Sequence, residues 1–91
     1  MIEHRVDDNG KVEAYCVWRI VRADGQMDDL GKFVFVDELW IHKSAFNKGY
    51  IRDFINTISD KAPTAMYGYW LRRKHGNRSK IFSRERLNKE I

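Results

Sequence analysis

The sequence is poor in the features that mark secreted, disulfide-rich or membrane-spanning proteins. Its 91 residues include one cysteine and one proline, and no apolar run approaches the roughly 18 residues of a membrane span. A lone Cys16 excludes an intramolecular disulfide, and its place in an alternating apolar segment predicts a buried, inert thiol. The first ten residues lack the apolar core of a signal peptide. We therefore expect a cytoplasmic protein that does not enter a membrane.

Motifs for metal, nucleotide or nucleophilic chemistry are also missing. The histidines, His4, His42 and His75, are far apart in the sequence, and with a single cysteine no spacing resembles a metal-ligand pattern. The sequence has no phosphate-binding Walker loop, no dinucleotide fingerprint and no Ser-His-Asp arrangement. We predict no metal site.

The composition is that of one folded domain with an uneven charge. Apolar residues make up 43% and aromatic residues 13% of the chain, which is typical of a packed globule, and residues 1–91 fit a single domain. The net charge of +4 is concentrated in the last third, because residues 61–91 hold 9 basic and 2 acidic side chains. This block either attracts an anionic partner or is a solvated basic face.

Two strands are predicted in the first half of the chain. Residues 12–22, VEAYCVWRIVR, alternate with period two, and residues 23–26 with Gly25 supply a turn. Residues 33–41, FVFVDELWI, are apolar on both faces except at Asp37 and Glu38. Such a strand belongs in the middle of a sheet with something packed on each face.

A helix and a second hairpin are predicted in the second half. Ile51 is expected to begin an apolar stripe that continues through Phe54, Ile55, Ile58 and Ala62 and ends at Pro63, with Ser44 or Asn47 as the cap. Residues 65–73 and 80–84 read as strands joined by a turn at residues 75–78. The prediction is an α+β fold: a small mixed, mostly antiparallel sheet of about five strands, with one main helix in a right-handed crossover.

The strand-to-helix join, residues 38–51, ELWIHKSAFNKGYI, resembles the central strand, glycine loop and helix of the GCN5-related acetyltransferases. In that family a Gln/Arg-x-x-Gly-x-Gly/Ala loop presents backbone N–H groups to the pyrophosphate of acetyl-coenzyme A, at a helix N-terminus suited to anions. The family's first position falls on Phe46, its first glycine on Gly49 and its last small residue on Ile51. The resemblance implies a reduced acyl-coenzyme A N-acyltransferase fold with a degenerate cofactor loop.

The same resemblance implies a set of site residues. Acetyl-coenzyme A would be held by Lys43, Lys48, Gly49, Tyr50 and Arg52. Glu38, or less favourably Asp37, would be the general base for an acceptor amine, and adjacent strand residues are expected to face opposite sides. The family's first strand and two leading helices are expected to have no counterpart before Val12. An acceptor pocket would then come from a second subunit, which favours a homodimer.

A second hypothesis rests on the basic block. Arg72, Arg73, Lys74, Arg78 and Lys80 lie in the predicted C-terminal hairpin near Tyr69, Trp70 and Phe82, and cations beside aromatic rings suit nucleic acid. The aromatic residues also fit a core. Two functions stay open: a small acetyltransferase-like protein whose acetyl-coenzyme A binding is weak or lost, or a non-enzymatic protein whose basic hairpin binds nucleic acid or an acidic protein.

Overall fold

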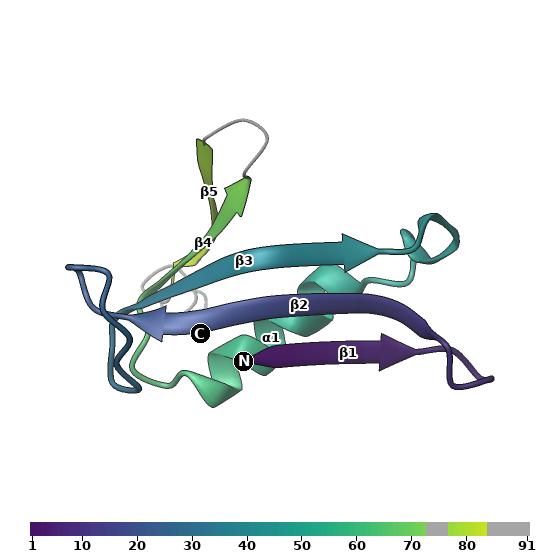
Figure 1. Cartoon of the computed structure of the whole chain (residues 1–91), viewed down its shortest axis with the longest axis horizontal. Helices are drawn as coiled ribbons and strands as arrows, with labels where there is room; N and C mark the ends of the chain where they lie inside the picture. The colour runs from purple at the N-terminus through teal and green to yellow at the C-terminus, as the bar shows by residue number, and fades with distance from the viewer. Residues whose placement is uncertain (73–76, 84–91) are drawn as a thin grey trace.

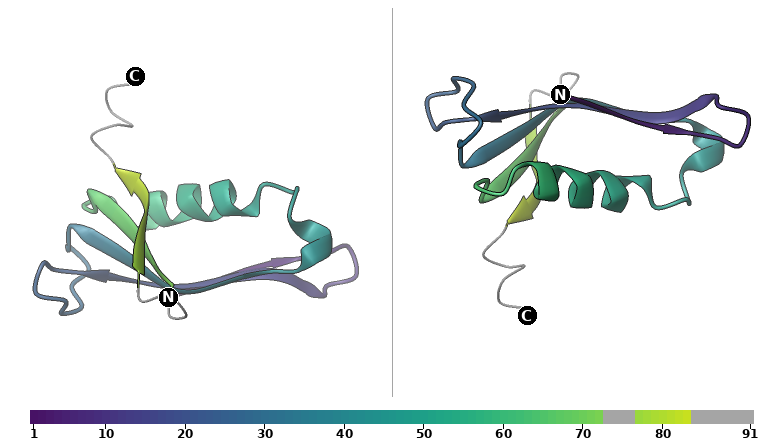
Figure 2. Two further views of the ribbon diagram at one scale, coloured as in Figure 1. Left: turned by 90° about the horizontal axis from the view of Figure 1, so that it is seen from above. Right: turned by 90° about the horizontal axis from the view of Figure 1, so that it is seen from below.

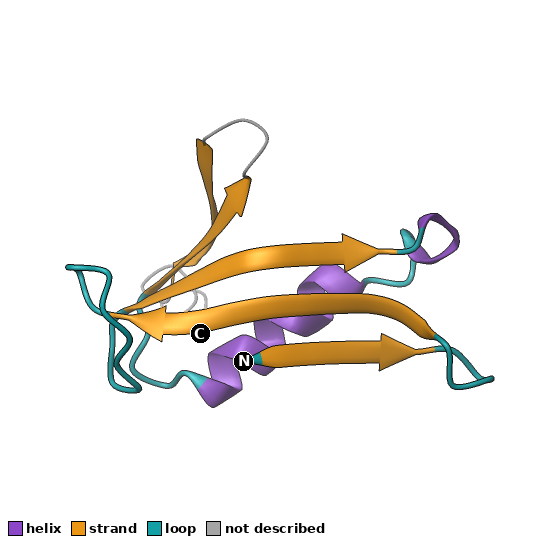
Figure 3. Cartoon of the chain, in the orientation of Figure 1, coloured by secondary structure: helices purple, strands orange, loops and turns teal. Residues whose placement is uncertain are grey.

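Among the residues that the structure describes, five strands form one open sheet with one α-helix packed against it (Figures 1 and 3). The computed structural model describes residues 1–72 and 77–83. Neighbouring strands are antiparallel except for the parallel pair β3 and β4. The predicted small, mostly antiparallel α+β fold is therefore confirmed. The elements in chain order are β1 (Ile2–Val6), β2 (Val12–Val21), β3 (Phe33–Ile41), the 3₁₀ turn η1 (Lys43–Ala45), α1 (Tyr50–Lys61), β4 (Tyr67–Arg72) and β5 (Asn77–Ser83).

The helix α1 lies on one face of the sheet (Figure 2), and the hydrophobic core lies between them. Alternation along β2 buries one predicted face, from Ala14 through Cys16 and Trp18 to Ile20, whereas Val12 at the strand's start is 41% exposed. From the other elements, Val34, Val36, Phe54, Ile58 and Phe82 complete this core. Burial raises the pKa of the Cys16 thiol to about 11, so the thiolate nucleophile is scarce at neutral pH, in line with the inert role predicted for it.

The helix ends where predicted, but its buried stripe differs from the prediction. The Ala62 N–H donates to the Ile58 carbonyl just before Pro63. Ile51, predicted as the first core residue, is 50% exposed, and this prediction is wrong. The inward row begins at Tyr50 and runs through Phe54 and Ile58, positions four residues apart that share one helix face. Ile51 lies about 100° around the helix from Tyr50 and about 60° from Phe54, at the edge of that row.

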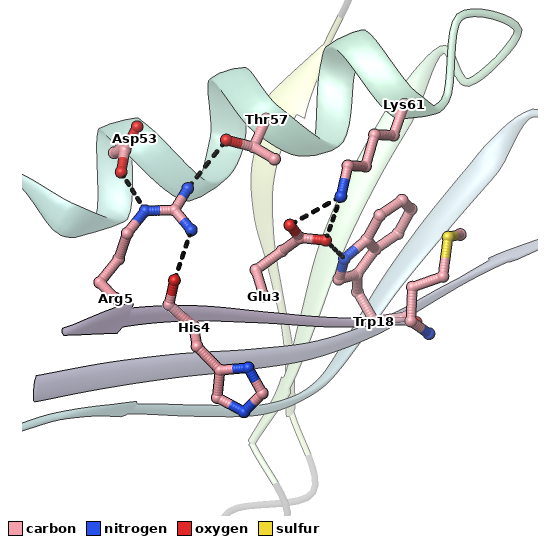
Figure 4. Close-up of polar contacts among 8 residues, drawn as sticks. Glu3, His4, Arg5, Trp18, Asp53, Thr57 and Lys61 are labelled. Atoms are coloured by element: carbon pink, nitrogen blue, oxygen red, sulfur yellow. Dashed lines mark hydrogen bonds and ion pairs between the residues drawn. The ribbon is translucent and has the colours of Figure 1, made fainter. Parts of the chain in front are cut away.

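A strand that the sequence analysis did not predict precedes Val12. In β1 the residues that face α1 are charged (Figure 4): Arg5 pairs with Asp53 and donates to Thr57 Oγ1 at 2.9 Å. Glu3 accepts two 2.9 Å hydrogen bonds from Lys61 and one of 3.3 Å from Trp18 Nε1. The local sequence pattern therefore missed this strand, and the expectation about the family's first strand and two leading helices stays a prediction.

Candidate ligand groove

The strands β3 and β4 separate halfway along their length. They pair only between Phe33–Val36 and Tyr67–Trp70, and beyond this point β4 and β5 turn away from β3 (Figure 1). The register of β2 on β3 shifts there, leaving Asp37 as an extra residue. This is a β-bulge, which bends a strand and increases its twist. The edge of β3 after the bulge has no strand partner on the β4 side among the described residues.

An apolar groove occupies the space where the two strands diverge. It has a volume of about 490 Å³ and is lined by Leu39, Trp40, Ile41, Phe46, Ile51 and Trp70. Three of these side chains are unusually open for their size: Trp40 is 40%, Ile51 50% and Phe46 69% exposed. A small apolar cavity of about 20 Å³ between α1 and the sheet shares Leu39, Ile51 and Trp70 with the groove. Concave, mostly apolar surfaces of this kind are typical ligand sites.

The N-terminus of α1 lies beside the groove, because Ile51 in its first turn lines it. Neither Ser44 nor Asn47 caps the helix, so that prediction is wrong. The N-cap is Gly49, which has a left-handed φ of 75° and makes no side-chain cap hydrogen bond. A Cβ built on Gly49 would meet no atom within 4 Å. The first N–H groups of a helix lack intrahelical partners and, with the helix dipole, favour an anion.

The loop before α1 is fixed to β2 by a residue that the sequence analysis missed. Glu13 accepts a hydrogen bond of 2.6 Å from Lys48 Nζ and one of 2.5 Å from the Tyr50 hydroxyl. The hydrogen bond from Lys48, joined by that from Tyr50, lowers the pKa of the Glu13 carboxyl, and the same contacts raise the pKa of Lys48 and of Tyr50. Lys48 and Tyr50, predicted as cofactor ligands, thus position the loop.

Glu13 points toward α1 because it is the extra residue of a second irregularity. In the register of β1 on β2, Arg5 faces Ala14 and Val6 faces Val12, which leaves Glu13 without a partner on β1. No sequence signal identifies this residue, because the alternating pattern of residues 12–22 predicts that Glu13 faces away from the core.

The remaining predicted cations are exposed. Lys43 and Arg52 lie on either side of Gly49 in the sequence, and both are solvent-accessible. Neither makes an ion pair within residues 1–72 and 77–83. They are therefore the cations nearest to the helix N-terminus in the sequence that do not already neutralise a carboxylate.

The two predicted acids lie on the sheet face opposite α1. Asp37 lies 3.2 Å from Arg19 Nε, and the exposed Glu38 is paired in register with Val17, an outward residue of β2. The bulge places these neighbours on the same face, so the expectation that they face opposite sides is wrong. Glu38 does not line the groove, but Trp40, two residues further along the same face, does.

No protein-family model matches the chain, and no curated protein is detectably similar to it. Within the described residues no group of three or more His, Cys, Asp or Glu side chains could hold a metal ion. No helix in that part of the chain is long and apolar enough to cross a membrane.

The predicted C-terminal hairpin is present, as antiparallel β4 and β5. Of its five predicted cations, Arg73 and Lys74 lie outside the described residues, as do the side chains of Arg72 and Arg78. Lys80 is exposed, and its Nζ lies 5.4 Å from the centre of the Tyr67 ring. The nucleic-acid hypothesis stays a prediction.

Proposed function

We propose that this chain is a small acetyltransferase-like protein that binds an acyl-coenzyme A in the groove between β3 and β4. The observation that carries the proposal is the divergence of two parallel strands after a bulge, next to a helix whose N-terminus has no side-chain cap. This arrangement offers an apolar channel and an anion-binding end at the same site.

The chemistry of coenzyme A matches these two parts. Its pantetheine arm carries methylene groups and two amides, which suit an apolar groove beside the unpaired edge of β3. Its phosphates suit the free N–H groups at the start of α1, with Lys43 and Arg52 as flanking charges. Phe46 and Ile51 narrow the groove near the helix, and Lys48 is already paired with Glu13. We therefore expect weak binding.

Amine acetylation would use Glu38. The acceptor nitrogen attacks the thioester carbonyl, a C–N bond forms, and the C–S bond breaks to release coenzyme A as the thiol. Glu38 accepts the proton that the ammonium form of the amine must lose before attack. Its place on β3, two residues before the groove residue Trp40, supports this role. Replacing Glu38 with Gln should abolish acetylation of a small amine but leave coenzyme A binding intact.

Titration calorimetry with coenzyme A tests the proposed binding site. The double variant Lys43→Ser/Arg52→Ser should bind coenzyme A at least about tenfold more weakly, because two cations near the phosphates are lost. The matched control, Lys11→Ser/Lys32→Ser, removes the same charge from exposed positions in other loops and should bind as the parent does. If both double variants bind coenzyme A equally weakly, the effect comes from net charge alone and contradicts this binding site.

A further inference from the structure

The sheet face opposite α1 carries two groups of apolar and aromatic side chains, here together called the aromatic face, with Arg19, Asp37 and Glu38 between them. Its rings contact one another across strands: Tyr15 and Trp40 are 5.7 Å apart, Phe33 and Tyr67 5.9 Å, and Phe35 and Tyr69 6.1 Å between ring centres. The register of the sheet assigns its members from four strands, Ile2, Tyr15, Val17, Phe33, Phe35, Trp40, Tyr67 and Tyr69.

The aromatic face is open in the structure. None of its members is fully buried, and Ile2 is 57% exposed. Figure 2 shows α1 on the other side of the sheet, and no helix among the described residues lies over the aromatic face. A strand such as β3, apolar on both faces, is typical of a sheet that is covered on both. Exposed apolar surface often marks an interaction site, and protein interfaces are enriched in Tyr, Trp and Phe.

We propose that a second copy of this chain covers the aromatic face, in a twofold dimer that packs sheet against sheet. The charges on this face are self-complementary. Glu38 is exposed on β3 and makes no ion pair within the described residues, while Lys80, on β5, contacts only the Tyr67 ring there. In an isologous interface each contact occurs twice, so Glu38 can meet Lys80 of the partner subunit while Lys80 meets the partner's Glu38. A partner of a different sequence could be bound without a positive and a negative side chain together on this face, whereas a twofold dimer uses both.

The dimer has a consequence for catalysis that rests on the proposed function. Glu38 lies on the face that the second copy would cover, so its ion pair with Lys80 of the partner subunit would compete with its role as the base. Dimer formation itself does not depend on coenzyme A binding and can be tested without it.

Sedimentation equilibrium of the full chain over a wide concentration range tests the dimer. We expect a reversible transition from 10.9 kDa to twice that mass. Phe35→Arg, in the middle of the aromatic face, should hold the chain at the monomer mass. Phe46→Arg makes the same chemical change at an exposed position outside this face and should leave the dimer intact.

Charge reversal identifies the occupant and does not depend on the folding of the Phe35 variant. Glu38→Lys and Lys80→Glu should each raise the dimer dissociation constant at least about tenfold, because each puts like charges together twice. The double variant should regain most of the lost affinity. A chain that stays monomeric at millimolar concentration overturns the proposal. So does a dimer indifferent to both reversals, or a monomer whose aromatic face is protected by a single-stranded oligonucleotide.

Discussion

Ile51 shows how one residue can satisfy a helical pattern and still lie outside the core. Its spacing to Phe54, Ile55 and Ile58 fits an apolar stripe, but the sheet contacts the row that starts one residue earlier, at Tyr50. The half-exposed side chain instead lines the groove and the small cavity beside it. Periodicity identifies an apolar sector of a helix without fixing which edge of that sector is covered.

The first prediction compares two isoleucines of α1. Ile51→Ala should cost less than about 2 kcal/mol of unfolding free energy, because the side chain is half exposed, whereas Ile58→Ala, at a position 1% exposed, should cost about 2–5 kcal/mol. Urea unfolding measures both. Ile51→Ala should also strengthen coenzyme A binding by widening the groove. If both variants lose the same unfolding free energy, Ile51 is a core residue and does not line a groove.

The second prediction concerns the buried Glu3. Burial alone would raise the pKa of its carboxyl, but the hydrogen bonds from Lys61 and Trp18 outweigh burial and lower it below 4.5. A carboxyl with a lowered pKa in the folded state stabilises the protein fully above pH 4.5, and this stability is lost as the pH falls through the folded-state pKa. Glu3→Gln should cost about 1–2 kcal/mol at pH 7 and flatten the fall of stability below pH 4.5.

Lys61→Met tests the same ion pair from the α1 side. Like Glu3→Gln, it should make the unfolding free energy depend less on pH below 4.5. Urea unfolding between pH 3 and pH 7 measures both variants. If the unfolding free energy of both variants falls with acid as steeply as that of the parent chain, Glu3 contributes nothing to the acid sensitivity.

At the scale of elements, local patterns predicted β2, β3 and α1 to within a residue or two. The alternation of β2, the apolar run of β3 and Pro63 after α1 are local signals that act within a single segment. They failed for β1, because its inward residues are Glu3 and Arg5 and their partners Lys61 and Asp53 lie 58 and 48 positions away. Ion pairs between distant segments leave no period in a sequence.

The candidate site was predicted in part for a similar reason. The glycine loop at the start of α1 is a local feature, and Gly49 indeed adopts a left-handed conformation there. The groove depends on the bulge at Asp37 and on the divergence of β4, neither of which changes the composition of the strands. Trp40 and Phe46 therefore read as core or loop residues, and only the fold brings them together.

The third prediction tests how the β4–β5 hairpin packs. A Cβ at Gly68 would collide with the ring of Phe82, which lies across it in register. Gly68→Ala should therefore cost about 1–3 kcal/mol through overpacking. The shape of Leu at position 82 relieves this contact, so Gly68→Ala/Phe82→Leu should be more stable than the sum of the two single variants predicts. Strict additivity in urea unfolding would exclude the close approach of the two residues.

At the scale of the whole molecule, the uneven charge makes the competing nucleic-acid hypothesis testable by the salt dependence of binding. Nucleic-acid binding by the basic hairpin would weaken steeply with salt, because cations such as Arg72, Arg78 and Lys80 release counterions from phosphates. Replacing these three with Ser should then reduce the slope of log affinity against log salt concentration. No binding at low salt, or an unchanged slope, would remove this hypothesis.

The described part of the chain combines a sheet face covered by α1, a second face that no described helix covers, and a groove where β3 and β4 separate. Thermal unfolding with and without coenzyme A tests whether this groove binds the ligand. A ligand at 100 times its dissociation constant adds about 2.7 kcal/mol, and a domain of this size gains about 4–8 °C per kcal/mol. We predict a rise of several degrees at millimolar coenzyme A, smaller with pantetheine alone and lost in Lys43→Ser/Arg52→Ser. An unchanged melting temperature at millimolar coenzyme A would show that the groove does not bind this ligand.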